Sequence, residues 1–208
     1  MLSLRRLSAV LVLLLPLALT AQMPNIPQFS ADMSMSGQGG HEMQGKMYFG
    51  GSKIRMDMNA QGHDTEMIHN MTTKTTYMVM PQQKMYMEFT ANSAGMMQRG
   101  PDWNSMRNYD PNNPCATDPD RTCKKVGTEE VNGRMCDKWL FTSKKNPEET
   151  QTTWIDQKLH FPIRNVTAST TWNLTNLKEG SQEASLFEVP SGFRKMDMGG
   201  MMGGRPPQ

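Results

Sequence analysis

The sequence is poor in the residue types that carry most enzyme chemistry. It has three cysteines and four histidines, and aromatic residues make up 7% of its 208 residues. His41-Glu42 begins like a zinc-protease motif, but Gly45 stands where the second histidine is required. No Gly-x-Ser-x-Gly elbow occurs, and the glycines at 37–40 precede an extended segment, whereas a phosphate loop precedes a helix. We therefore expect no enzymatic activity and no cofactor.

The chain also lacks a strong charge of either sign. It carries 22 Lys and Arg against 20 Asp and Glu, a formal net charge of +2. Two of those arginines, Arg5 and Arg6, lie in the first 21 residues, and the rest of the chain is close to neutral. No basic patch with interleaved aromatic residues occurs, so nucleic acid is not an expected partner.

Only the N-terminus has a long apolar run, from Leu7 to Ala18, preceded by Arg5 and Arg6. Small or uncharged residues follow up to Ala21, and this order is typical of a cleavable signal peptide spanning residues 1–21. The run is shorter than the roughly 20 residues that span a bilayer. No cysteine near the cut offers a lipid attachment point. These features predict a periplasmic or secreted protein that does not span the membrane after cleavage.

Most of the remaining chain shows the period-two pattern of β-strands. In Lys53 to Asn59, Ile54, Met56 and Met58 alternate with polar residues, which gives the segment one apolar face. Asn132-Gly133, between two extended runs, is a strong hairpin signal. Strands are expected at 29–36, 43–49, 53–59, 65–70, 75–80, 85–89, 125–131, 134–143, 150–157 and 161–177. The pattern predicts an all-β, or β-dominated, protein.

Two segments interrupt or follow this pattern. Residues 91–122 are polar and rich in Asn, Asp and Pro, with one short helix expected near 102–107. Residues 196–208 contain mainly Met, Gly and Pro and are expected to be disordered. The expected organisation is a signal peptide (1–21), a single β domain (22–195) and a tail (196–208).

Several short motifs occur in the order found in one family. They are Phe29-Ser-Ala-Asp, Lys53-Ile-Arg-Met, Tyr77-Met-Val-Met-Pro, Lys84-Met-Tyr-Met, Gly127-Thr-Glu-Glu-Val-Asn-Gly, Cys136-Asp-Lys-Trp, Thr153-Trp-Ile-Asp, Phe161-Pro-Ile-Arg and Ser185-Leu-Phe-Glu-Val-Pro-Ser-Gly-Phe. Over about residues 29–195 the chain resembles an uncharacterised periplasmic family grouped with the LolA and LolB lipoprotein carriers. The resemblance implies a strongly curved antiparallel half-barrel, with a long loop or short helices covering its concave side. In the carriers that cavity holds acyl chains, and the covering segment here would be 91–122.

Methionine is the most unusual feature of the composition. Of 22 methionines, 15 lie between Met33 and Met106, and several form i, i+2 pairs that share one face of a strand. The expected ligand-binding residues are Met56, Met58, Met78, Met80, Met85 and Met87. Three interpretations stay open: an ordinary core, a deformable apolar cavity, or a soft-metal site, because thioethers suit Cu(I). For the metal interpretation the candidate ligands are Met196, Met198, Met201 and Met202.

The three cysteines allow one short disulfide. Cysteines in an oxidising compartment usually pair, and Cys115 and Cys123 bracket a short loop. A two-residue turn at Asn132-Gly133 places Cys136 opposite Glu129 and Cys123 opposite Thr142, too far apart to join. We expect a Cys115–Cys123 disulfide and a buried free thiol at Cys136.

These features together predict a non-catalytic periplasmic protein that binds a hydrophobic or lipid-like ligand. One alternative is a methionine-rich binder of Cu(I) or Ag(I). Another is an envelope structural or interaction protein without a small ligand.

Overall fold

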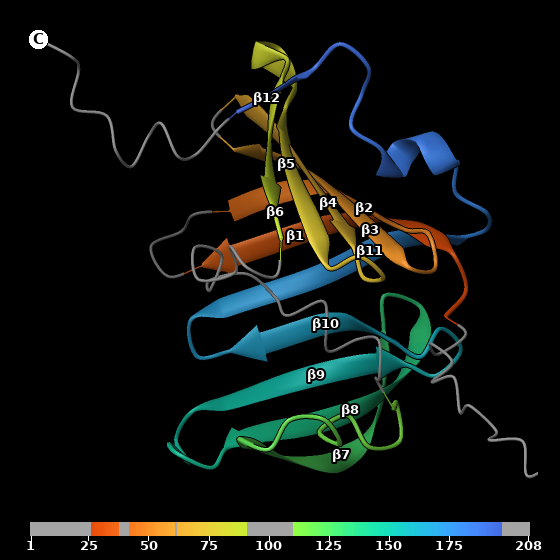
Figure 1. The fold of residues 1–208 in the computed structure, drawn as a ribbon. Coiled ribbons are helices and arrows are strands. Elements are labelled where there is room, and N and C mark those ends of the chain that lie inside the picture. Colours follow the sequence, from red (N-terminus) through yellow and green to blue (C-terminus); the bar gives the residue numbers. More distant parts are fainter. Residues whose placement is uncertain (1–25, 38–41, 61, 91–109, 197–208) are drawn as a thin grey trace, which may run out of the picture.

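Twelve strands of the described residues form one sheet in the order β12-β6-β5-β4-β3-β2-β1-β11-β10-β9-β8-β7 (Figure 1). The computed structural model describes residues 26–37, 42–60, 62–90 and 110–196. The strands are β1 (Phe29–Gly37), β2 (Glu42–Phe49), β3 (Lys53–Ala60), β4 (His63–Asn70), β5 (Thr75–Met80), β6 (Met85–Phe89), β7 (Arg121–Val131), β8 (Arg134–Ser143), β9 (Thr150–Asp156), β10 (Phe161–Thr167), β11 (Thr170–Glu179) and β12 (Arg194–Lys195). The 3-10 helices η1 (Pro81–Gln83) and η4 (Ala184–Phe187) accompany them.

The sheet consists of two antiparallel meanders that meet at one strand pair. Strands β1 to β6 form the first meander and β7 to β11 form the second. The pairing of β1 with β11 joins them, which places the start of the domain beside its C-terminal part (Figure 1). Among the described strands, only β12 is added in parallel, along β6. The β-dominated fold expected from the sequence is confirmed.

Local turn chemistry explains where the strands end. Asn132 and Gly133 both have positive φ (53° and 76°), as a type I′ hairpin turn requires, so this expected hairpin is confirmed. The single strand expected at 161–177 is wrong, because β10 and β11 are separate. The Thr167 hydroxyl accepts hydrogen bonds from the backbone N–H groups of Ser169 and Thr170, which turns the chain without Gly or Pro.

Irregularities in pairing shift two parts of the register. In β7 the pairing slips between Lys125 and Gly127, so Cys123 lies opposite Phe141, and the expected pairing with Thr142 is wrong by one residue. The expected pairing of Glu129 with Cys136 is confirmed, because it lies between the slip and the turn. A second irregularity lies in β10, between Pro162 and Arg164.

Three aromatic rings show which way the sheet curves. Phe49 on β2 and Phe161 on β10 have β1 and β11 between them, so a flat sheet would separate their backbones by about 14 Å. Their ring centroids are only 5.4 Å apart. Phe29 contacts both rings, and all three belong to the main buried cluster. The sheet therefore bends toward the face that carries Phe49, which is its concave face.

The opposite face of the first meander has a separate, smaller core. Ile68 and Val79 are buried there under Phe187 of η4. A Cβ on Gly50 would lie 2.5 Å from the Phe187 ring, so this contact requires glycine. The Arg55 guanidinium donates to the Leu186 carbonyl at 3.1 Å and fixes the same segment. Short helices were expected on the concave side, whereas η4 covers the other face. The expected loop cover lies in 91–122, of which 91–109 is outside the described residues.

A disulfide joins Cys115 to Cys123 at the start of β7, with the two Cα atoms 5.7 Å apart. It closes the turn that precedes the strand. None of the helices that the structure describes is long and apolar enough to cross a bilayer.

Removing this disulfide by replacing Cys115 and Cys123 with alanine is expected to lower the free energy of unfolding by about 2 kcal/mol, because the unfolded chain gains loop entropy. Urea denaturation of the oxidised protein and of the double variant measures the difference. An unchanged midpoint would contradict the expectation.

Candidate ligand-binding face

Methionines from five adjacent strands lie directly opposite one another. The row runs through Met47, Met56, Met67, Met78 and Met87, on β2 to β6. Directly opposite residues of antiparallel strands project from the same face. Phe49 follows Met47 by two residues, so this face is the concave one.

A neighbouring row extends the same surface. Met33 lies opposite Gly45, which lies opposite Met58, and Met80 lies opposite Met85. Met58, Met80 and Met85 are each two residues from a member of the first row on the same strand, so they project from the same face. Met33 is two residues from Ala31, which lies directly opposite Met47. The register therefore brings all six candidate methionines to one concave surface, which we call the methionine face.

Burial divides the methionine face into two parts. Met47 is 0% exposed and Met56 is 4% exposed, so both are ordinary core residues. Met58 and Met67 are half-buried and pack against that core. The methionines of β5 and β6 (Met78, Met80, Met85 and Met87) are also half-buried. The interpretation as ordinary core thus applies to the centre of the sheet, while the thioethers of β4 to β6 are only half-buried.

The face that carries Met35 continues into the second meander with aromatic and polar residues. Successive directly opposite pairs connect Met43, Met35, Trp172, Asn165, Thr153 and Trp139, from β2 to β8. Trp139 is 8% exposed. Its indole Nε1 and the Asn165 Oδ1 are buried, and neither has a hydrogen-bond partner among the described residues. Buried polar atoms without partners are rare in native proteins.

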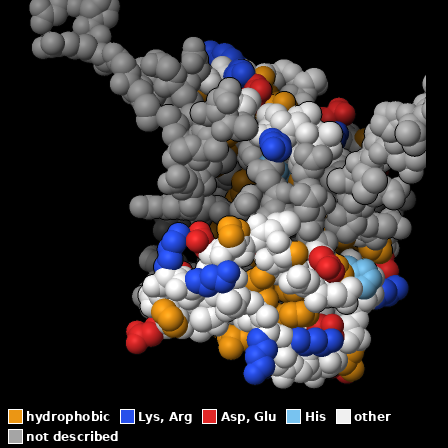
Figure 2. Space-filling model, turned by 60° about the horizontal axis from the view of Figure 1, so that its bottom comes forward, with side chains coloured by type: hydrophobic (Ala, Val, Ile, Leu, Met, Phe, Trp, Pro, Cys, Tyr) orange, Lys and Arg blue, Asp and Glu red, His pale blue; other side chains and the backbone are white. Residues whose placement is uncertain are grey.

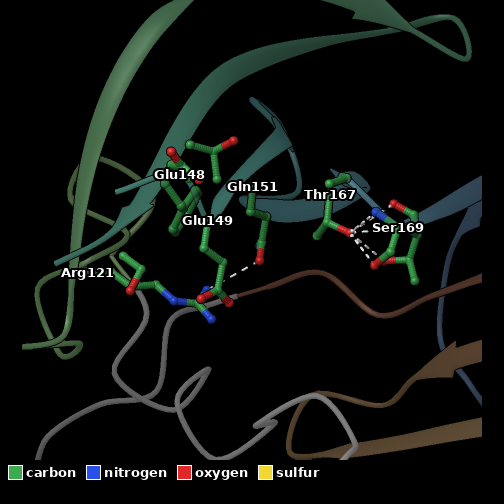
Figure 3. Close-up of a pocket in the computed structure, with 11 residues that line it drawn as sticks. Arg121, Glu148, Glu149, Gln151, Thr167 and Ser169 are labelled. Atoms are coloured by element: carbon green, nitrogen blue, oxygen red, sulfur yellow. Dashed lines mark hydrogen bonds between the residues drawn. The ribbon is translucent and has the colours of Figure 1, made fainter. Parts of the chain in front are cut away.

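A polar pocket of about 340 Å³ opens beside this row (Figure 3). Three of its lining residues lie directly opposite one another on β8, β9 and β10: Phe141, Gln151 and Thr167. On each strand this residue is two positions away from the row that contains Trp139, Thr153 and Asn165. Arg121, Glu148 and Glu149 enter from β7 and the loop before β9, and Ser169 enters from the turn after β10. The Gln151 amide donates to the Thr153 hydroxyl at 3.2 Å, which connects the pocket to the row.

The lining of the pocket has one cation and two carboxylates. The Arg121 guanidinium lies 3.5 Å from the Asp118 carboxylate and donates to the Gln151 side-chain oxygen at 3.3 Å. Glu148 and Glu149 add negative charge to the lining. The surface nearby has the same mixed character. At the end of the molecule that carries β7, β8 and β9, hydrophobic side chains lie between Lys, Arg and acidic side chains (Figure 2).

Cys136 is the free thiol, as expected, and it is fully buried. Burial and the nearby Asp156 carboxylate raise the pKa of Cys136 to about 12. A thiol with this pKa is protonated at neutral pH and is a poor nucleophile. No three His, Cys, Asp or Glu side chains of the described residues are grouped as metal ligands.

The C-terminal methionines can be placed only in part. Met196 is half-buried, and its backbone N–H donates to the Tyr86 carbonyl at 2.8 Å on β6. Met198, Met201 and Met202 lie outside the described residues, so the tail metal site stays a prediction.

Sequence reasoning did not single out Trp139, Asn165 or the polar pocket. Their shared face depends on the register across β8 to β11, including the irregularity in β10. The order of strands in the sheet was also needed to connect Trp172 with Met35. The i, i+2 spacing of the methionines, in contrast, was visible in the sequence.

Comparison with solved structures gives several matches at low identity. An uncharacterized conserved protein from Thermus thermophilus is 10% identical over 83% of this chain and 91% of that chain, with a TM-score of 0.55. A chain of the Pseudomonas aeruginosa MucA/MucB complex is 13% identical over 79% of this chain, with a TM-score of 0.51. This chain spans 56% of that one. A LolA superfamily protein from Nitrosomonas europaea is 8% identical over 81% of this chain and 92% of that chain, with a TM-score of 0.36.

At these identities the first two matches show a shared fold and nothing about activity. No curated protein matches the sequence. One family model matches residues 30–160, from β1 to the turn after β9, and its description is a domain of unknown function. The chain, with its open and curved antiparallel sheet, therefore belongs to the DUF4412 family.

Proposed function

We propose that the protein is a non-catalytic binder of a hydrophobic, lipid-like ligand, which lies along the methionine face. The observation that supports this most is the row of directly opposed methionines whose β4 to β6 members are half-buried. Unbranched thioether side chains adapt to irregular apolar ligands, which a wall of branched side chains does less readily. The signal-peptide pattern at 1–21 supports export, and we propose the periplasm as the place of binding.

The shape of this surface suits one acyl chain. Residues two apart on a strand are separated by about 7 Å, so the two rows form a narrow strip that crosses the strands. Each methylene of a chain buried there would contribute about 0.8 kcal/mol. The strip continues toward Trp172 and the polar pocket, which gives an amphiphile an apolar and a polar end.

Titration of the delipidated mature protein with a fluorescent fatty acyl probe tests this function. We expect saturable binding with one probe per chain, and displacement of the probe by an unlabelled amphiphile of the same chain length. A signal that rises linearly with probe and resists competition would overturn the proposal, because it reports nonspecific partition.

A second candidate function is binding of Cu(I) or Ag(I). It is supported by Met67, Met78 and Met87, which are half-buried and directly opposite one another on three adjacent strands. Opposed side chains have Cβ atoms about 5 Å apart, so three thioether sulfurs could converge on one soft ion. Thioethers release no proton on binding, so the affinity would be nearly independent of pH. Competition with a Cu(I) chelator at pH 6 and pH 8 separates this function from lipid binding.

A further inference from the structure

Within the described residues, two buried polar atoms without partners lie on the face that carries Met35 and Trp172. The Trp139 Nε1–H donor and the Asn165 Oδ1 acceptor project from the same face, on β8 and β10, with Thr153 between them on β9. The polar pocket opens beside them. An unsatisfied buried donor or acceptor costs free energy that a suitable ligand group would recover.

We propose that Trp139 and Asn165 select the polar head group of the bound amphiphile, and that this head group is neutral and carries both a hydrogen-bond acceptor and a donor. This inference rests on the proposed function. In an amide or hydroxyl head group, the oxygen accepts from the Trp139 Nε1–H and an N–H or O–H donates to the Asn165 Oδ1.

The surroundings of the pair favour a neutral head group. Arg121, the cation that lines the pocket, already contacts Asp118 and Gln151, so it offers little to a carboxylate. Glu148 and Glu149 line the same pocket and would repel an anion. The chain of the amphiphile then runs past Trp172 toward the half-buried thioethers of β4 to β6.

Three ten-carbon probes separate head-group selection from chain binding. Decanamide offers an acceptor and a donor, methyl decanoate offers an acceptor only, and decanoate is an anion without a donor. Isothermal titration calorimetry of the mature protein should show that decanamide binds about tenfold more tightly than methyl decanoate. The reason is that only decanamide has an N–H group to donate to the buried Asn165 Oδ1. Decanoate should bind more weakly than decanamide.

Two variants assign this preference to the named atoms. Asn165→Leu should weaken the binding of decanamide about tenfold, to the affinity of methyl decanoate, and should leave the binding of methyl decanoate unchanged. Trp139→Phe should weaken both probes, because it removes the donor that both carbonyl oxygens use.

Trp154→Phe is the matched control. Trp154 follows Thr153 on β9, so it projects from the other face of that strand, where it is 6% exposed and belongs to the main buried cluster. Its Nε1 donates to the Glu129 carboxylate at 3.1 Å. This variant should leave binding of the probes unchanged. It should lower Tm more than Trp139→Phe does, because it alone loses a hydrogen bond, and Asn165→Leu should not lower Tm.

The outcomes separate the two proposals. Saturable binding of all three probes with equal Kd, in wild type and variants, would overturn the head-group inference and leave the proposed function standing. Tightest binding of decanoate would also overturn it. Absence of saturable binding for every probe would overturn the proposed function itself.

Discussion

Replacing Asp156 with alanine is expected to lower the free energy of unfolding by about 2–4 kcal/mol, because it removes a buried salt bridge and leaves two backbone N–H groups without an acceptor. Asp156 is 1% exposed, at the end of β9. Its carboxylate forms a salt bridge with Arg134 and accepts the backbone N–H groups of Lys158 and Leu159 at 2.8 and 2.7 Å. These bonds hold the turn to β10, which positions Phe161 in the core.

Asp120→Ala is the control for this variant. Asp120 pairs with Lys145 at 3.0 Å, but both side chains are more than half exposed. Exposed pairs contribute about 0–1 kcal/mol, so this variant should unfold at nearly the wild-type urea concentration. A loss below about 1 kcal/mol for Asp156→Ala would contradict the structural role, since a buried pair must cost more than that.

The pH dependence of stability gives a second check on Asp156. Burial alone would raise the pKa of this carboxyl, but the hydrogen bonds from Arg134 and from the Leu159 and Lys158 N–H groups lower the pKa below its ordinary value of 3.8. A carboxyl with a lowered folded-state pKa stabilises the protein above its unfolded pKa. That stabilisation is lost as the pH falls through the folded pKa. The difference in stability between wild type and Asp156→Ala should therefore be full at pH 6 and shrink below about pH 4.

Replacing Met78 with aspartate is expected to weaken binding of an acyl probe by at least about 100-fold. Met78 lies in the centre of the half-buried part of the methionine face, between Met67 and Met87. A carboxylate there would have to lose its hydration against the acyl chain, which costs several kcal/mol. The same titration that establishes wild-type binding measures the change.

Two further variants separate lost binding from lost folding. Met78→Leu conserves volume and apolar character, so binding and Tm should stay close to wild type. Met135→Asp places the same charge on a residue that is 50% exposed and outside the methionine face, and it should not affect binding. If Met78→Asp stays folded and binds the probe like wild type, the chain does not lie on this face.

The sequence predicted the strands well because alternation and turn residues coincide. Ile54, Met56 and Met58 share a face in β3, as their spacing required. The turn after Thr167 was missed because a threonine hydroxyl replaces the usual Gly or Pro. Cys123 was placed one residue out of register because an irregularity between Lys125 and Gly127 carries no clear sequence signal.

The candidate site could be predicted only where it depends on neighbours along the chain. Each i, i+2 methionine pair indicates a shared face within its strand. Which methionines are core and which are exposed depends on the curvature that brings Phe49 to Phe161. Trp139 and Asn165 share a face through pairings across three strands, and no local pattern encodes that register.

The central claim, that an acyl chain lies on the methionine face, is tested most directly by NMR of the mature protein with ¹³C-labelled methionine methyl groups. Titration with decanamide should shift the methyl signals of Met67, Met78, Met80 and Met87 and leave that of Met135 unchanged. Titration with Ag(I) on a second sample identifies soft-metal binding by the same signals. Saturating decanamide that moves none of the four signals, or moves Met135 equally, would contradict the account.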